Sequence, residues 1–156
     1  MSRARSPRPR FLRRILAAGL ALVLGAGPLL AAELKLELRL IWCTNEKLPH
    51  DKHKEVEPAT VEKFRKVPFK WKYYYEIKRV TGTVPSRGTK PFTMSDKCTI
   101  EITEMAGPKV EAKLIGEGRP VVKATKNLAP GEWTTIGGDD KDGAGWFVLI
   151  TELGEK

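Results

Sequence analysis

The chain has 156 residues, and its 28 lysines and arginines outnumber its 19 aspartates and glutamates, giving a formal net charge of +9 at pH 7. Six of these positive charges are arginines among the first 32 residues, which contain no acidic residue, so the rest of the chain has 22 basic and 19 acidic side chains. The basic composition is therefore mostly a property of the N-terminus and gives no support to nucleic-acid binding. We expect no nucleic-acid partner.

The N-terminal segment has the three parts of a secretory signal. Its arginine-rich start is followed by an apolar run, Ile15 to Leu30, and then by Ala31 and Ala32, the small residues that a signal peptidase accepts. The run is shorter than the roughly 20 residues that span a bilayer. We predict a signal peptide over residues 1–32, no stable membrane span after cleavage, and a periplasmic or secreted protein. The alternative is an uncleaved membrane anchor.

The remaining residues have the pattern of an all-β domain. Apolar side chains fill every second position from Leu34 to Trp42, as in a strand with one buried face. The alternation recurs in 69–80 and 98–105, and shorter apolar stretches between Gly and Pro turns follow near 110–114, 120–126, 132–136 and 146–153. A short helix is expected at 59–66. We predict a single β-sandwich or barrel-like domain over 33–156, with about seven or eight mostly antiparallel strands and one helix.

The stretch 69–80 gives the predicted binding surface. In an uninterrupted strand every second side chain lies on the same face. The face expected in the core holds Phe69, Trp71, Tyr73, Tyr75 and Ile77, and the face expected in solvent holds Lys70, Lys72, Tyr74, Glu76 and Lys78. A basic outer face suits an acidic envelope protein or an anionic polymer. We predict a binding site at Lys70, Lys72, Tyr74 and Lys78.

The chain has two cysteines, Cys43 and Cys98. Because an isolated pair in an oxidising compartment favours one bond, we predict a Cys43–Cys98 disulfide. The alternative is two buried thiols, since sequence does not show whether the two Cα atoms come within bridging distance.

The two histidines, His50 and His53, form the one cluster that resembles a metal site. Two imidazoles near Glu55 and Glu57 can bind zinc, although three neighbouring lysines oppose a cation: Lys47, Lys52 and Lys54. An irregular, solvated loop explains the same residues.

Motifs of enzyme chemistry are sparse after residue 32. The two serines there, Ser86 and Ser95, do not occur in a G-x-S-x-G motif. We therefore expect no cofactor and predict an exported, non-enzymatic binding or structural module of the cell envelope. The alternatives are an envelope hydrolase that uses carboxylates or a metal at His50 and His53, and a subunit of a larger complex joined by strand addition. The oligomeric state stays open.

Overall fold

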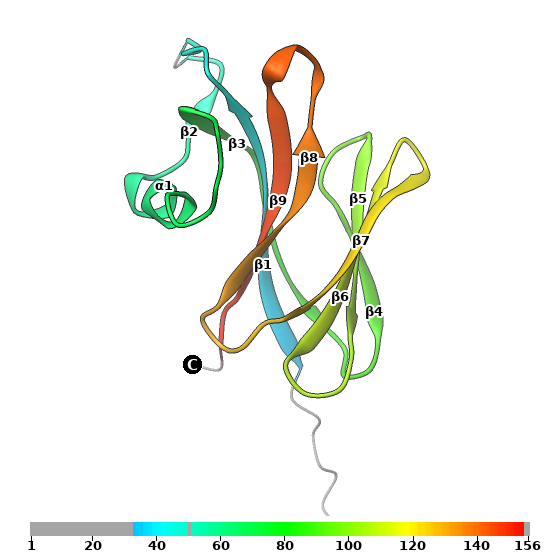
Figure 1. The fold of residues 1–156 in the computed structure, drawn as a ribbon. Coiled ribbons are helices and arrows are strands. Elements are labelled where there is room, and N and C mark those ends of the chain that lie inside the picture. The colour runs from blue at the N-terminus through cyan, green and yellow to red at the C-terminus, as the bar shows by residue number, and fades with distance from the viewer. Residues whose placement is uncertain (1–32, 50, 155–156) are drawn as a thin grey trace, which may run out of the picture. The chain divides into compact units, whose positions relative to one another are not determined.

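The computed structural model describes residues 33–49 and 51–154. They form two antiparallel sheets stacked face to face, with one short helix on the outside (Figure 1). The prediction of an all-β sandwich is confirmed, and the barrel-like alternative is wrong because the described strands do not close into a barrel. The predicted signal peptide and His50 lie outside the described residues. No helix within the described ranges has the length and apolar content to cross a membrane.

The five-stranded sheet has the order β2-β3-β1-β9-β8. Its strands are β1 (Leu34–Thr44), β2 (Lys54–Glu55), β3 (Tyr73–Val84), β8 (Trp133–Asp139) and β9 (Gly145–Glu152). The four-stranded sheet runs β4-β5-β6-β7, with β4 (Thr89–Thr93), β5 (Cys98–Glu104), β6 (Lys109–Gly116) and β7 (Arg119–Asn127). The helix α1 (Pro58–Phe64) precedes β3, and a 3-10 turn, η1 (Lys141–Gly143), joins β8 to β9.

The main core lies between the two sheets. Leu36, Leu38 and Leu40 of β1 meet the buried side chains of the opposite sheet, among them Ile100 and Leu114. Burial of each such side chain contributes about 1.5–3 kcal/mol. The alternation predicted for β1 thus has its expected cause, a strand whose apolar face covers a second sheet.

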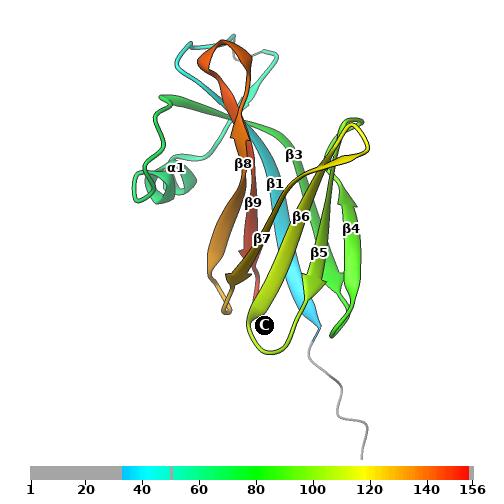
Figure 2. The same cartoon turned by 45° about the vertical axis from the view of Figure 1, so that its right-hand side comes forward.

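A second core lies on the other face of the five-stranded sheet, where α1 covers it (Figure 2). Phe64 of α1 is buried against Tyr74 and Phe147, with ring centroids 5.0 and 5.2 Å away. Because β9 has the sandwich on one face and this aromatic cluster on the other, Phe147 to Ile150 are all buried. That explains why β9 is continuously apolar instead of alternating.

A β-bulge at Ile77 overturns the face assignment predicted for 69–80. The strand begins at Tyr73, and Leu40 pairs with Lys78 while Ile41 pairs with Glu76, so Ile77 is an extra residue. A bulge reverses the alternation of side chains beyond it. Ile77, predicted in the core, is 50 % exposed. Tyr74 and Tyr75 precede the bulge and are both buried for another reason, since the cluster under α1 covers Tyr74 on one face and the rings of Trp42 and His53 pack against Tyr75 on the other.

The predicted disulfide is also wrong in this structure, which contains Cys43 and Cys98 as free, buried thiols. Cys43 belongs to the core under α1, and Cys98 belongs to the core between the sheets. The five-stranded sheet therefore separates them. Burial raises the pKa of both thiols, that of Cys43 to about 12.

Candidate functional site

A cavity of about 550 Å³ opens between the two sheets at one end of the sandwich. We call it the end cleft. The five-stranded sheet contributes Trp42, Ile77 and Trp146, and the turns of the other sheet contribute Ser95, Lys97 and Glu117. Buried Leu40 and Cys98 also line it. Ligand pockets of small molecules commonly have volumes of about 300–1,000 Å³ and a mostly apolar lining.

Strand register places a row of aromatic rings beside this cleft. Trp42 of β1 lies directly opposite Tyr75 of β3 and Trp146 of β9, and Trp146 in turn lies opposite Gly138 of β8. Residues that are paired in register point to the same face, so the row faces the four-stranded sheet. Trp42 and Trp146 are only partly buried, because the row lies where the sandwich opens.

The bulge in β3 supplies the most exposed apolar side chain of the end cleft. Ile77 is a lining residue, and half of its surface is accessible. Bulges often occur next to functional sites, where they redirect a side chain. Because Ile77 is the extra residue of the bulge, it has no partner on β1, and its side chain is exposed at the cleft instead of packing in the core.

Charged side chains surround the end cleft without giving it a net charge. Lys97 and Lys141 contribute two cations, and Glu117 and Asp140 contribute two carboxylates. All four are exposed. The cleft is thus apolar inside and polar at its margin, and its electrostatic balance does not favour an ion of either sign.

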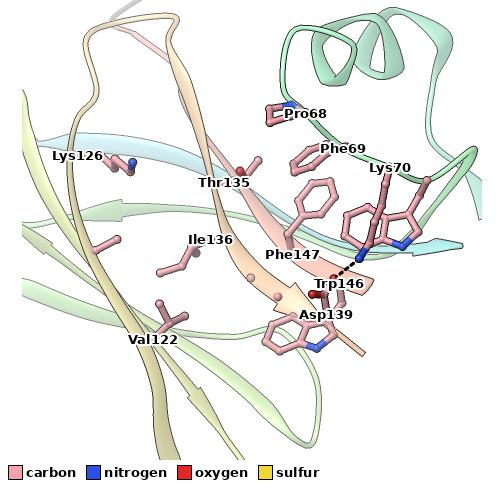
Figure 3. Close-up of a pocket in the computed structure, with 14 residues that line it drawn as sticks. Pro68, Phe69, Lys70, Val122, Lys126, Thr135, Ile136, Asp139, Trp146 and Phe147 are labelled. Carbon is pink, nitrogen blue, oxygen red and sulfur yellow. Dashed lines mark ion pairs between the residues drawn. The ribbon is translucent and has the colours of Figure 1, made fainter. Parts of the chain in front are cut away.

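A second hollow of about 470 Å³ lies along the side of the sandwich, where β7 and β8 end the two sheets (Figure 3). We call it the edge groove. Val122 and Lys126 of β7 line it on one side, and Ile136 of β8 lies toward them across the hollow. Trp146 lines both the edge groove and the end cleft, so its ring marks the boundary between the two hollows.

The segment before β3 borders the edge groove on the outer face of the sheet. Phe69 stacks on Phe147 with ring centroids 4.9 Å apart, and Lys70 forms an ion pair with Asp139 of 3.0 Å (Figure 3). The Nζ of Lys70 also lies 5.3 Å from the ring centre of Trp71. The Trp71 Nε1 donates to the carbonyl of Gly143 at 2.9 Å, which fixes this segment to the turn between β8 and β9.

The structure does not bring the four residues of the predicted binding surface together. Lys70 lies at the edge groove, and Lys72 is exposed in the segment before β3. Tyr74 is buried under α1, where its hydroxyl donates to the Trp71 carbonyl at 3.2 Å, and burial raises its pKa, with a smaller contribution from Cys43. Lys78 pairs with Leu40 beyond the bulge and therefore lies on the opposite face of β3.

The predicted metal site is described only in part. The ring of His53 packs beside Trp42 and Tyr75, with centroids 6.1 and 5.6 Å away, and its Nδ1 is enclosed without a hydrogen-bond partner among the described residues. No group of three potential metal ligands occurs in 33–49 and 51–154. His53 therefore has the surroundings of an aromatic packing residue.

The strongest electrostatic cluster joins α1 to the sheet. Arg39, 4 % exposed, forms ion pairs with Glu57 and Glu76 of 2.5 Å each, and Arg79 forms pairs of 2.6 and 2.8 Å with the same carboxylates. Partial burial opposes ionisation of Glu57, but its own backbone N–H and the two guanidinium groups outweigh this and lower its pKa to about 2. Burial likewise opposes ionisation of Glu76, and hydrogen bonds from Arg79 and Lys54 with the charge of Arg39 lower its pKa. The cluster is internally neutralised and has a structural role.

Sequence reasoning missed the residues of the end cleft. The alternation that identified Trp42 as a core residue does not reveal that the sandwich opens beside it, and the bulge at Ile77 has no signature in the apolar pattern. Trp146 occurs in a stretch that was correctly predicted as an apolar strand. Its exposure depends on how far the four-stranded sheet reaches, which sequence does not indicate.

Comparisons of the chain with known proteins found no match. No family model matches the chain, and no curated protein and no solved structure matches it either. Its function must therefore be inferred from the hollows and side chains of the sandwich itself.

Proposed function

We propose that this chain is an exported, non-enzymatic binding module of the cell envelope, which holds its ligand in the end cleft. The N-terminal sequence supports export, because it has the layout of a secretory signal. The observation that carries the binding proposal is the half-exposed Ile77, placed by a bulge at a cleft that also exposes Trp42 and Trp146. Exposing these apolar side chains together costs solvation free energy that a bound ligand would recover.

The chemistry of the end cleft favours an uncharged, amphipathic ligand. The two indole rings offer flat apolar surfaces. The rim has two cationic and two anionic side chains, which provide hydrogen-bond donors and acceptors. A sugar ring matches this arrangement, since its C–H face can stack on an indole while its hydroxyl groups reach the rim. The dispersed lysines predicted from sequence have no part in this site.

Titration with soluble sugar oligomers tests the proposal. Oligomers of N-acetylglucosamine and of glucose, in a series of increasing length, are titrated into the protein, and the tryptophan fluorescence is recorded. We expect a saturable change, and we expect Ile77→Ser to weaken binding about five- to thirtyfold, the effect of losing ~1–2 kcal/mol of apolar contact.

Met105→Ser provides the matched control, because Met105 is also an exposed apolar side chain, 37 % accessible, and lies outside the cleft lining. It should bind like the wild type. Equal loss in both variants, or no fluorescence change with either sugar, would contradict the end cleft as the site. Cleavage of the oligomers during the titration would favour the hydrolase alternative.

The export part of the proposal needs its own measurement. We expect the protein expressed in a bacterium with its full N-terminus to be recovered from the periplasm or medium, with a mature sequence that begins near Glu33. Recovery of the uncleaved chain in the membrane fraction would instead support the anchor.

A further inference from the structure

The free edge of β8 differs from the other free edges of the two sheets. A sheet edge presents unpaired N–H and C=O groups, and proteins usually protect it with charged side chains turned inward, proline or bulges. In β4, Lys90 pairs with the core residue Ile102 and thus points inward, and Pro91 follows it. In β7, Lys126 pairs with buried Val110 and the strand has a bulge opposite Ile115.

The free part of β3 is protected in a similar way, since the bulge at Ile77 is followed by Lys78 and Arg79. In β8, by contrast, the stretch Trp133 to Gly138 has no charged side chain and no proline, and its pairing with β9 has no register shift. Among the described strands, β8 is therefore the edge best suited to accept another strand.

Two glycines further open the backbone of β8. A Cβ on Gly137 would come within 2.2 Å of the Trp146 carbonyl oxygen, so glycine is required there for close pairing with β9. A Cβ on Gly138 would meet no atom within 4 Å. Gly137 and Gly138 are exposed and line the edge groove, so no side chain of theirs shields the backbone at this end of β8.

The edge groove also indicates what kind of segment would fit. Val122, Ala124 and Ile136 give its inner side an apolar surface next to β8. Of its charged residues, Asp139 is neutralised by Lys70, whereas Lys126 has no ion-pair partner among the described residues. The groove therefore has one unbalanced positive charge.

We infer that β8 accepts an extended segment of a partner protein as a sixth strand of the five-stranded sheet, with alternating apolar side chains and an acidic residue that reaches Lys126. Main-chain hydrogen bonds to β8 would supply affinity, and the apolar side of the groove together with Lys126 would supply specificity. This inference is independent of the end cleft, because it uses a different hollow and a different class of partner.

Two nine-residue peptides test it. Both alternate valine and threonine, and the central valine is replaced by glutamate in one and by lysine in the other. Backbone amide exchange is followed by NMR in the full mature protein. We expect the glutamate peptide to slow exchange at least about tenfold within Trp133–Asp139, and the lysine peptide to bind about fivefold more weakly.

Charge reversal at Lys126 then tests whether the acidic residue of the bound segment contacts this lysine. Lys126→Glu should weaken the glutamate peptide about fivefold and favour the lysine peptide, whereas Lys109→Glu, which makes the same charge change outside the groove lining, should do neither. Unchanged exchange in β8 at millimolar peptide, or the same effect of both variants, would overturn the inference. Slow exchange in β8 that appears without peptide and grows with protein concentration would also overturn it, because a second copy would then occupy the edge.

Discussion

Arg39 and Arg79 occupy directly opposite positions on β1 and β3, and the carboxylates of Glu57 and Glu76 lie against both. Two like charges across a strand pair destabilise a sheet unless other groups compensate. Here one carboxylate comes from the bulged strand itself and the other from the residue that precedes α1. The pair of arginines therefore ties the position of the helix to the register of the sheet.

Removal of one carboxylate from this cluster should destabilise the folded protein, because a buried arginine then loses a partner. Glu76, with 7 % of its side chain exposed, lies next to the buried Arg39. We expect Glu76→Gln to lower the free energy of unfolding by about 3 kcal/mol, the low end for breaking a buried pair, since Glu57 still partners Arg39. Glu101→Gln breaks an ion pair with Lys113 in which both side chains are about one-third exposed, and it should lower the free energy of unfolding by less than about 1 kcal/mol. Urea titration of both variants measures the difference. Equal costs would show that Arg39 does not depend on Glu76.

Acid should destabilise the protein through the same carboxylates. Their pKa values are lowered in the folded state, that of Glu57 to about 2, so their contribution is complete above the ordinary value near 4.5 and is lost as the pH falls toward 2. We expect the melting temperature to fall over this range. In Glu57→Gln the fall should be smaller, and a pH profile identical to that of the wild type would contradict the assignment.

The two adjacent glycines of β8 should respond differently to alanine. The Cβ of Gly137→Ala would collide with backbone atoms of Trp146 and Phe147, at 2.2 and 2.4 Å. We expect a loss of about 1–3 kcal/mol, as for other overpacked positions. Gly138→Ala meets open space and should change stability by less than about 0.5 kcal/mol. Thermal unfolding of both variants measures this contrast, and similar melting temperatures would argue against the close β8–β9 pairing.

Phe64 should determine the stability of the core under α1. Its side chain is 1 % exposed and contacts four other aromatic rings, those of Phe69, Tyr74, Trp133 and Phe147. Phe64→Ala should lower the free energy of unfolding, measured by urea titration, by about 3–5 kcal/mol. It should also reduce the near-UV circular dichroism of the aromatic cluster. Val121→Ala, at a side chain that is 57 % exposed, should leave both measurements nearly unchanged. An unaltered near-UV spectrum in Phe64→Ala would show that α1 does not complete a packed core.

Both thiols should be unreactive in the folded protein. Cys43 and Cys98 are buried, and burial raises the pKa of each, so little thiolate is available to attack a disulfide reagent. We expect Ellman's reagent to detect no thiol in native protein and two thiols in guanidinium chloride without added reductant. Detection of none after unfolding would mean that the two cysteines had been bonded.

The apolar alternation of β1 and β5 was sufficient to predict strands, since a strand with one covered face needs an apolar residue at every second position. The turn residues and the helix near 58–64 followed from equally local rules. β4 was not predicted, because the edge segment Thr89–Thr93 buries only Phe92 and contains a proline.

The sequence alone therefore determined the class of fold and most of the strands, and it is the basis of the export prediction. The tertiary structure decided which residues meet. One extra residue at Ile77 reverses the faces of β3, the sheet that divides the two cores separates Cys43 from Cys98, and the end of the four-stranded sheet decides that Trp42 and Trp146 border a cleft. Each of these features depends on pairing between strands that are distant in the chain. The pattern of neighbouring residues in the sequence does not reveal the register of that pairing.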